Sequence, residues 1–311
     1  MKIYSLFGAT KTNQLPQRST AVALGRFDGV HIGHRALISS MVCYAGTNGL
    51  EPLVWMVNCT CRELCNKADC RGGLLTNTHE KLELFRELGV KYVVIENFAD
   101  ICHLSPAEFV REKLHSALGC RVAFCGENFR YGKGAQGTPA TLGEQMNNFG
   151  GQAFVTPFVT VDKEIVSSTA IRAALFNGDM EKAATMLGRE FAIIGKVVQG
   201  EKLGRKLGFP TANIPYPKEK FPLPYGVYRS CFEVGGKVYP AITNIGTRPS
   251  VGGEKVLAET HLFDFSEDLY NQTATLHLHQ FIRSERRFNS LEELERAIAM
   301  DIVAVKKEWG I

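Results

Sequence analysis

The spacing of apolar residues changes near Gly188, where a helical period gives way to alternation. Before that point, short apolar runs typical of buried strands occur at residues 21–24, 52–57, 92–95, 121–125 and 153–161. Helical stripes stand between these runs, and Asn77 with Glu80 and Ser105 with Glu108 have the spacing of helix capping boxes. Strands that alternate with helices predict an α/β domain, built on a parallel sheet with both faces covered.

After Gly188, apolar and polar residues alternate as in half-buried strands. Strands are expected at residues 191–198, 226–234, 237–245, 258–265 and 274–282, with a two-residue hairpin turn at Gly235 and Gly236. Five or six antiparallel strands in so short a stretch predict a small barrel. A capping box at Ser290 predicts a last helix, whose buried stripe would consist of Leu291, Leu294, Ile298, Ile302 and Val305. We therefore expect two domains, 1–188 and 189–311.

The first predicted strand ends in a glycine-rich turn that leads into a helix. Gly25, Gly29 and Gly33 punctuate this turn, and His31 and His34 stand three residues apart. Backbone N–H groups and the positive end of a helix suit a phosphate, and both imidazoles would lie on one face of the first helical turn. The same pattern also fits a strand–helix turn that only needs its glycines, with two surface histidines.

A row of hydroxyl side chains precedes another predicted helix. Ser167, Ser168 and Thr169 are followed by Arg172, on the first helical turn. One of the three hydroxyls would be enough for an N-cap, which is the simpler interpretation. All three together with an arginine would suit a polyphosphate.

In the second domain a glycine-rich loop that begins at Gly204 leads into an extended segment. Thr211 and Asn213 are two residues apart, hence on one side of this segment. Their neutral oxygens could help to hold Mg²⁺ when nucleotide phosphates supply the charge, although an ordinary β-bend would carry the same residues. Glu259 is a single carboxylate in an otherwise apolar strand, and it either pairs with a cation or acts as a base.

Residues 126–137 resemble two well-known nucleotide-binding motifs, but their position and spacing do not fit either one. Residues 132–137 match GxGxxG, but they stand late in the domain, and Thr138-Pro139 should interrupt a helix that opens directly from them. A P-loop also fails, because five residues rather than four separate Gly126 from Gly132 and a glycine follows Lys133.

The composition is that of an ordinary globular protein of about two domains. Of the 311 residues, 45% are hydrophobic and 22% are charged. The net charge of +4 is small, and no basic tail indicates that the protein binds nucleic acid. The sequence has no signal-peptide pattern and no apolar run of membrane-spanning length, so we expect a cytoplasmic protein.

Nine cysteines are a high number for that compartment, and four of them cluster as Cys59, Cys61, Cys65 and Cys70. Their spacing is not that of paired CxxC zinc sites. Free thiols are the default interpretation, with zinc or a redox role as the alternative.

Two sets of motifs, taken together, resemble the bacterial bifunctional riboflavin kinase/FMN adenylyltransferase family over nearly the whole chain. The first set is GRFDGVHIGH at 25–34, LLTNTHEK at 74–81, GENFRYG at 126–132 and SSTAIR at 167–172. The second set is GRKLGFPTANI at 204–214, PYGVY at 224–228, NIGTRPS at 244–250, ETHLFDF at 259–265 and SERRFNSLEEL at 284–294. No single motif identifies the family, but the order and spacing of all of them together are specific to it.

This resemblance implies a nucleotidyltransferase-like, Rossmann-like α/β domain followed by a six-stranded kinase barrel with a terminal helix. It implies that riboflavin and ATP give FMN, and that FMN and a second ATP give FAD and pyrophosphate, with Mg²⁺ required. The partners would be these small molecules, without nucleic acid or membrane, and the chain would be a monomer or a weak homo-oligomer.

The resemblance also assigns residues to roles. Glu259 would be the kinase base, His31 and His34 would serve adenylyl transfer, and Thr211 and Asn213 would bind Mg²⁺ with ATP. The remaining ATP and phosphate residues would be Gly25, Phe27, Asp28, Gly33, Ser167, Ser168, Thr169, Arg172, Gly204, Arg205 and Gly208. Asn128 and Arg283 would contact the flavin.

The chain departs from the family's pattern after the second strand. Where the family usually has Phe, an acid, Pro, His and Pro, this chain has Val57, Asn58, Cys59, Thr60 and Cys61. An alternative is therefore a riboflavin kinase whose adenylyltransferase half is weakened or inactive. A second alternative, from another class, is a non-catalytic flavin-binding regulatory protein.

Overall fold

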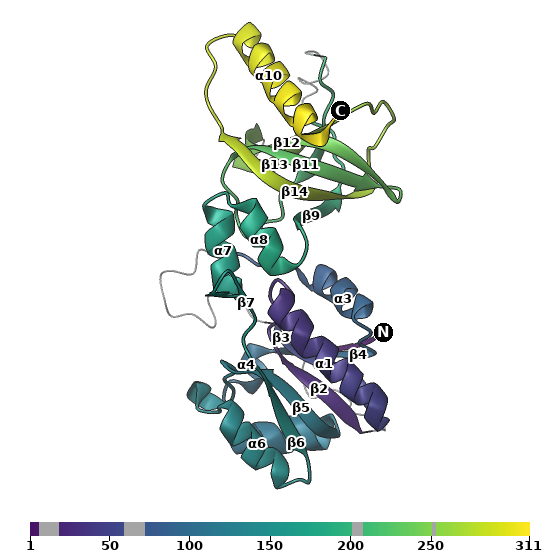
Figure 1. The fold of residues 1–311 in the computed structure, drawn as a ribbon, viewed down its shortest axis with the longest axis vertical. Helices are drawn as coiled ribbons and strands as arrows, with labels where there is room; N and C mark the ends of the chain where they lie inside the picture. The colour runs from purple at the N-terminus through teal and green to yellow at the C-terminus, as the bar shows by residue number, and fades with distance from the viewer. Residues whose placement is uncertain (6–18, 59–71, 201–207, 251–252) are drawn as a thin grey trace. The chain divides into compact units, whose positions relative to one another are not determined.

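The computed structural model describes residues 1–5, 19–58, 72–200, 208–250 and 253–311. The chain divides into two compact units, Met1–Ser168 and Thr169–Ile311 (Figure 1). The cysteine cluster, Gly204 and Arg205 lie outside the described residues. The domain boundary at 188 remains a prediction.

The first unit is built on a six-stranded parallel sheet in the order β1-β4-β3-β2-β5-β6. Its strands are β1 (Lys2–Ser5), β2 (Thr20–Gly25), β3 (Glu51–Asn58), β4 (Tyr92–Asn97), β5 (Cys120–Gly126) and β6 (Gln152–Thr156). The crossover segments include α1 (Ile32–Asn48), α3 (Thr78–Glu87), α4 (Phe98–Ile101), α5 (Pro106–Glu108), the π-helix Phe109–Ala117 and α6 (Pro139–Asn147).

Alternate residues of β2 show that both faces of this sheet are covered. Ala21 and Ala23 pack in one core with α1 and α3, and Val22 and Leu24 pack in another with the π-helix and α6. The predicted α/β architecture is therefore confirmed. The predicted capping boxes at Asn77/Glu80 and Ser105/Glu108 are also present.

Three details of the sequence interpretation are wrong or incomplete in this unit. Residues 153–161 are not one strand, because β6 ends at Thr156 and β7 (Thr160–Val161) pairs with β8 (Glu164–Ile165) in a separate hairpin. Strand β1 and helix α6 were missed. Thr138 and Pro139 start α6 rather than interrupt a helix, since Thr138 is its N-cap and proline suits the first helical turn.

Two glycines of the GxGxxG segment, Gly132 and Gly137, are required by packing. A Cβ on Gly137 would lie 2.5 Å from the Tyr131 ring, and one on Gly132 would lie 2.8 Å from the backbone N of Pro106. Because side chains and backbone fill this space, these glycines do not form an open cradle for a dinucleotide.

The second unit contains an antiparallel sheet in the order β10-β13-β12-β11-β14-β9. Its strands are β9 (Phe191–Lys196), β10 (Ala212–Pro215), β11 (Gly226–Val234), β12 (Lys237–Ser250), β13 (Gly253–Leu262) and β14 (Thr273–Ser284). A bridge between Val198 and Asn213 joins the two ends of this order, so the sheet closes toward a barrel. Helices α7 (Ser168–Phe176) and α8 (Met180–Leu187) precede it, and α10 (Leu291–Trp309) follows.

The predicted barrel, its Gly235-Gly236 turn and the terminal helix are confirmed. Tyr228 and Phe232 on β11 are fully buried inside, whereas Val227 on the opposite face packs against Ile302 and Val305 of α10. Leu291 was wrongly placed on the buried stripe of α10, because its side chain is 58% exposed in the first helical turn. Ser290 caps the helix as expected, but Glu293 accepts from the N–H of Asn289, so the reciprocal capping box is not formed.

Candidate active sites

The glycine loop after β2 has a strained backbone that several side chains hold in place. Phe27 and Val30 both have positive φ, 52° and 39°, which non-glycine residues rarely adopt. The Phe27 ring is fully buried against His34 and Phe85. The loop therefore has a fixed shape at the carboxyl end of the sheet and the N-terminus of α1, where ligands of such sheets bind.

Asp28 ties this loop to the segment before α3. Its Oδ1 accepts hydrogen bonds from the N–H groups of Leu75 (2.9 Å) and Thr76 (3.3 Å), and the Thr76 hydroxyl accepts from the N–H of Gly29 (2.9 Å). The Ser168 hydroxyl donates to the carbonyl oxygen of Asp28 (2.8 Å). Asp28 is thus occupied in shaping the loop, which positions the histidines that follow.

His31 and His34 stack on each other at the start of α1. Their ring centroids are 3.6 Å apart with an interplanar angle of 19°, and His31 is the N-cap, whose Nδ1 accepts from the N–H of His34 (3.3 Å). A Cβ on Gly33 would lie 3.2 Å from the His31 ring, so glycine leaves room for this arrangement. The two imidazoles do lie on one face of the first helical turn.

His34 is held in its neutral form. Burial lowers its pKa well below 6.5, and the nearby His31 and Lys81 lower the pKa further. Its Nδ1 is buried and has no hydrogen-bond partner among the described residues. A neutral imidazole beside a helix N-terminus can donate one N–H hydrogen bond to an anionic group.

This lowered pKa predicts a pH-dependent stability. Above pH 6.5 His34 is neutral in both the folded and the unfolded state, so it adds no pH dependence there. Below pH 6.5 the unfolded state binds the proton more readily, and the folded state loses at most about 1.4 kcal/mol per pH unit. The melting temperature of the wild type should therefore fall more than that of His34→Gln between pH 7.5 and 5.5. If the melting temperatures of the wild type and of His34→Gln fall equally over this pH range, His34 does not have a lowered pKa in the folded state.

The other residues proposed for this half come from the loop after β5 and from the segment that leads into α7. Asn128 is exposed in the loop after β5, the neighbour of β2. Ser167 and Ser168 end the first unit, and Thr169 and Arg172 follow in the second unit on α7.

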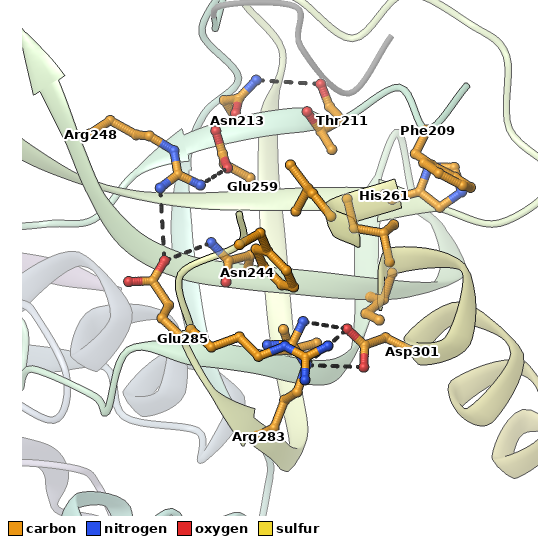
Figure 2. A pocket seen from close by; sticks show the side chains of 16 residues that line it. Phe209, Thr211, Asn213, Asn244, Arg248, Glu259, His261, Arg283, Glu285 and Asp301 are labelled. Carbon is orange, nitrogen blue, oxygen red and sulfur yellow. Dashed lines mark hydrogen bonds and ion pairs between the residues drawn. The ribbon is translucent and has the colours of Figure 1, made fainter. Parts of the chain in front are cut away.

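The second unit contains a cavity of about 400 Å³ between the barrel strands and the N-terminal half of α10 (Figure 2). Its apolar lining consists of Phe209, Val227, Ile242, Phe288, Leu294 and Ile298. Its polar lining consists of Thr211, Asn213, Asn244, Arg248, Glu259, His261, Arg283, Glu285, Arg286 and Asp301. Apolar walls with a few grouped polar side chains are typical of a site for a small organic ligand.

Strand register brings three polar side chains together on the wall of this cavity. Glu259 on β13 stands opposite Asn213 on β10 and opposite Asn244 on β12. Thr211 precedes Asn213 by two residues and also lines the cavity. Because side chains opposite each other in antiparallel strands share a face, the predicted metal residues and the predicted base belong to one site.

Asn213 has an unused acceptor in this site. The residue is 4% exposed, its Nδ2 donates to the carbonyl oxygen of Thr211 (3.4 Å), and its buried Oδ1 has no partner among the described residues. A buried oxygen without a donor is costly unless a ligand binds it. A neutral oxygen of this kind fits Mg²⁺ with nucleotide phosphates, whereas the described residues contain no His/Cys/Asp/Glu cluster that could hold a metal ion.

Two arginines of the cavity are paired with acids. Arg248 donates from Nη2 to Oε2 of Glu259 (2.5 Å), and its Nη1 lies 3.8 Å from Oε1 of Glu285. Arg283 binds Asp301 of α10 through Nη2 (2.6 Å) and Nε (3.1 Å). Arg283 therefore ties the terminal helix to β14 at the cavity wall (Figure 2).

Comparisons with known proteins agree with this two-site arrangement. A family model described as FAD synthetase matches residues 13–170, and one described as riboflavin kinase matches residues 187–309. Bifunctional riboflavin kinase/FMN adenylyltransferase of Escherichia coli K12 is 35% identical over 98% of this chain and 97% of its own, and that of Bacillus subtilis is 34% identical over 92% and 91%. The chain belongs to the bifunctional riboflavin kinase/FMN adenylyltransferase family.

A solved structure supports the fold of this family member along its whole length. The structure titled as a macrolide-efflux protein from Streptococcus pneumoniae is 24% identical, with a TM-score of 0.84 over 98% of both chains. At this identity the likeness concerns the fold alone. Among the described residues, no helix is both long enough and apolar enough to span a membrane.

Sequence reasoning assigned no role to several polar residues of the kinase cavity. Asn244, Arg248, His261 and Glu285 stand within quoted motifs but were given no function, and Asp301 was not mentioned. A signal was available in the strand period, since residues 242, 244 and 248 of β12 share a face, as do Glu259 and His261 of β13. Gly208, the predicted phosphate-binding glycine with which the described chain resumes, has a positive φ of 85°.

Proposed function

We propose that this chain phosphorylates riboflavin with ATP to give FMN, and then transfers the adenylyl group of a second ATP to FMN, which gives FAD and pyrophosphate. The observation that carries the proposal is the cavity in which Glu259 stands opposite Asn213, whose Oδ1 has no partner among the residues that the structure describes. A base and a metal-binding oxygen on paired strands are what phosphorylation of a hydroxyl requires.

In the kinase step the ribityl hydroxyl of riboflavin attacks the terminal phosphorus of ATP. Glu259 accepts the hydroxyl proton as the new P–O bond forms, and the bridging P–O bond breaks to release ADP. Thr211 and Asn213 would hold Mg²⁺, which neutralises charge on the phosphates. The apolar wall that includes Phe209, Ile242 and Leu294 suits a flat aromatic ring system such as the flavin. The contact of Arg283 with the flavin remains part of this proposal.

In the adenylyl-transfer step the FMN phosphate is already an anionic nucleophile, so no base is needed. His31, the neutral His34, the N-terminus of α1 and the hydroxyl of Ser167 would orient the ATP phosphates and stabilise the charge that develops on them. Together these groups would direct the FMN phosphate to the α-phosphorus and let pyrophosphate leave.

The decisive experiment follows both products from one purified chain. Incubation with riboflavin, ATP and Mg²⁺ should give FMN first and FAD later, and removal of Mg²⁺ with a chelator should stop both. Absence of both products would leave a non-catalytic flavin-binding protein as the better interpretation.

A specific observation keeps one alternative in the test. Strand β3 ends in Val57 and Asn58 where the family usually has an aromatic residue and an acid, and Cys59 to Cys61 lie outside the described residues. When FMN and ATP are supplied directly, rapid pyrophosphate release would exclude a weakened adenylyltransferase half. FMN formation from riboflavin, without pyrophosphate release from FMN and ATP, would favour a weakened adenylyltransferase half.

The cytoplasmic location, the monomeric or weakly oligomeric state and the absence of nucleic-acid partners remain predictions.

A further inference from the structure

Arg248 is a cation that the kinase cavity holds against its own proposed base. Its guanidinium bridges two carboxylates, with Nη2 at 2.5 Å from Glu259 and Nη1 at 3.8 Å from Glu285. Glu285 in turn accepts from Nδ2 of Asn244 (3.1 Å), and Arg248 Nη1 donates to the carbonyl oxygen of Thr247 (2.9 Å). Figure 2 shows this network on the wall that also carries Asn213.

This pairing conflicts with the work of a base. The Oε2 of Glu259 accepts a charge-assisted hydrogen bond from Arg248, so this oxygen is less accessible to the substrate hydroxyl, whereas proton transfer needs a carboxylate oxygen within hydrogen-bond reach of that hydroxyl. A step that loosens the Arg248–Glu259 contact would therefore favour the reaction.

The cavity also needs positive charge for its substrate. Three carboxylates line it, Glu259, Glu285 and Asp301. Of the other two arginines in the lining, Arg283 is bound by Asp301 through Nε and Nη2, and Arg286 lies over the Phe288 ring at 4.9 Å. A triphosphate that enters beside Glu259 would be repelled unless a cation meets it, because phosphoryl transfer is catalysed mainly by charge stabilisation. Metal and arginine are the usual groups for this task.

Geometry places Arg248 where such a cation is required. The attacking hydroxyl must lie within hydrogen-bond distance of Glu259 and about 3–3.5 Å from the terminal phosphorus. Arg248, in direct contact with Glu259, is therefore one side-chain rearrangement away from the oxygens of that phosphoryl group. Its long flexible stem and planar fork allow it to exchange a carboxylate for a phosphate.

We infer that Arg248 is a further substrate-binding residue of the kinase, which leaves Glu259 and Glu285 to bind the terminal phosphoryl group of ATP. This inference rests on the proposed kinase function of the cavity. Binding of ATP would therefore also break the contact between Arg248 and the base, Glu259. Arg248 holds Oε2 of Glu259 before ATP binds, and this oxygen becomes available for the hydroxyl proton when Arg248 moves to the phosphate.

The first test separates phosphate binding from a purely structural role by steady-state kinetics of FMN formation with the full chain. Arg248→Gln should raise KM for ATP about ten- to a hundredfold, as expected for loss of a hydrogen bond to a charged group. KM for riboflavin should change little, and Arg248→Lys should restore part of the ATP affinity, since it keeps the charge but not the fork. Arg287→Gln is the matched control, because Arg287 is exposed and does not line the cavity.

The second test uses the competing carboxylate. Glu285→Gln should lower KM for ATP about threefold by removing one partner of Arg248, and this gain should shrink in the Arg248→Gln background, where only the repulsion of the phosphates by Glu285 is removed. If Arg248→Gln lowers kcat and leaves KM for ATP unchanged, Arg248 only positions Glu259 and the inference is wrong. If the wild type forms no FMN at all, the proposed function itself fails, which is a separate result. Circular dichroism of each variant, with Arg248→Lys as the milder change, identifies loss of folding.

Discussion

Replacement of Glu259 with glutamine should lower the rate of FMN formation by a factor of about 10²–10⁴, the usual contribution of a general base. Glutamine has nearly the same shape, and its carbonyl oxygen can still accept from Arg248, so the cavity wall should keep its structure. What it lacks is the basic oxygen that takes the ribityl proton. Riboflavin binding, measured by quenching of flavin fluorescence, should therefore persist while turnover is lost.

A matched control for this prediction is Glu233→Gln on β11. Glu233 pairs with His277 (3.1 Å) and does not line the cavity, so its change should leave FMN formation within about twofold of the wild type. Glu259→Asp keeps the negative charge but shortens the side chain by one methylene. Its rate of FMN formation should lie between that of Glu259→Gln and that of the wild type. An unchanged rate in Glu259→Gln would remove Glu259 from the role of base.

The elements that the sequence predicts best are those with short-range signals. The turn after β2, the capping boxes at Asn77 and Ser105 and the Gly235-Gly236 turn each depend on residues within a few positions of one another. Strand β1 and helix α6 escaped because four edge residues give too little periodicity, and because proline was taken as an interruption rather than as the first residue of a helix.

The kinase cavity has the same division between local and distant information. Thr211, Asn213 and Glu259 could be proposed from their own segments, because a spacing of two or an isolated carboxylate is visible locally. The partners of Glu259 could not, since Arg248 is 11 positions away and its second carboxylate, Glu285, follows a different strand. Their meeting depends on the register of β12 with β13 and on the path of the chain after β14. A strand period identifies the face of such residues but not their neighbours.

Replacement of His34 with alanine should lower the conversion of FMN to FAD by a factor of about 10²–10³, the usual effect of removing one preorganised group that stabilises developing charge. His34 is a sharper target than His31, because the backbone N–H of residue 34 donates to His31 and survives the change. The helix cap is therefore retained, while the neutral imidazole, whose buried Nδ1 has no partner among the described residues, is lost.

The two activities on one chain supply an internal control for His34→Ala. Glu259 and its cavity belong to the other compact unit, so FMN formation from riboflavin should stay within about twofold of the wild type. Ser40→Ala, at an exposed position of α1, should leave both activities unchanged. Pyrophosphate release from FMN and ATP, measured beside FMN formation, distinguishes the outcomes. If FMN and FAD formation fall together, the change has unfolded the chain or coupled the two halves. If neither falls, the stacked histidines at the start of α1 are a packing feature of the strand–helix turn, and the phosphates of the second ATP bind elsewhere.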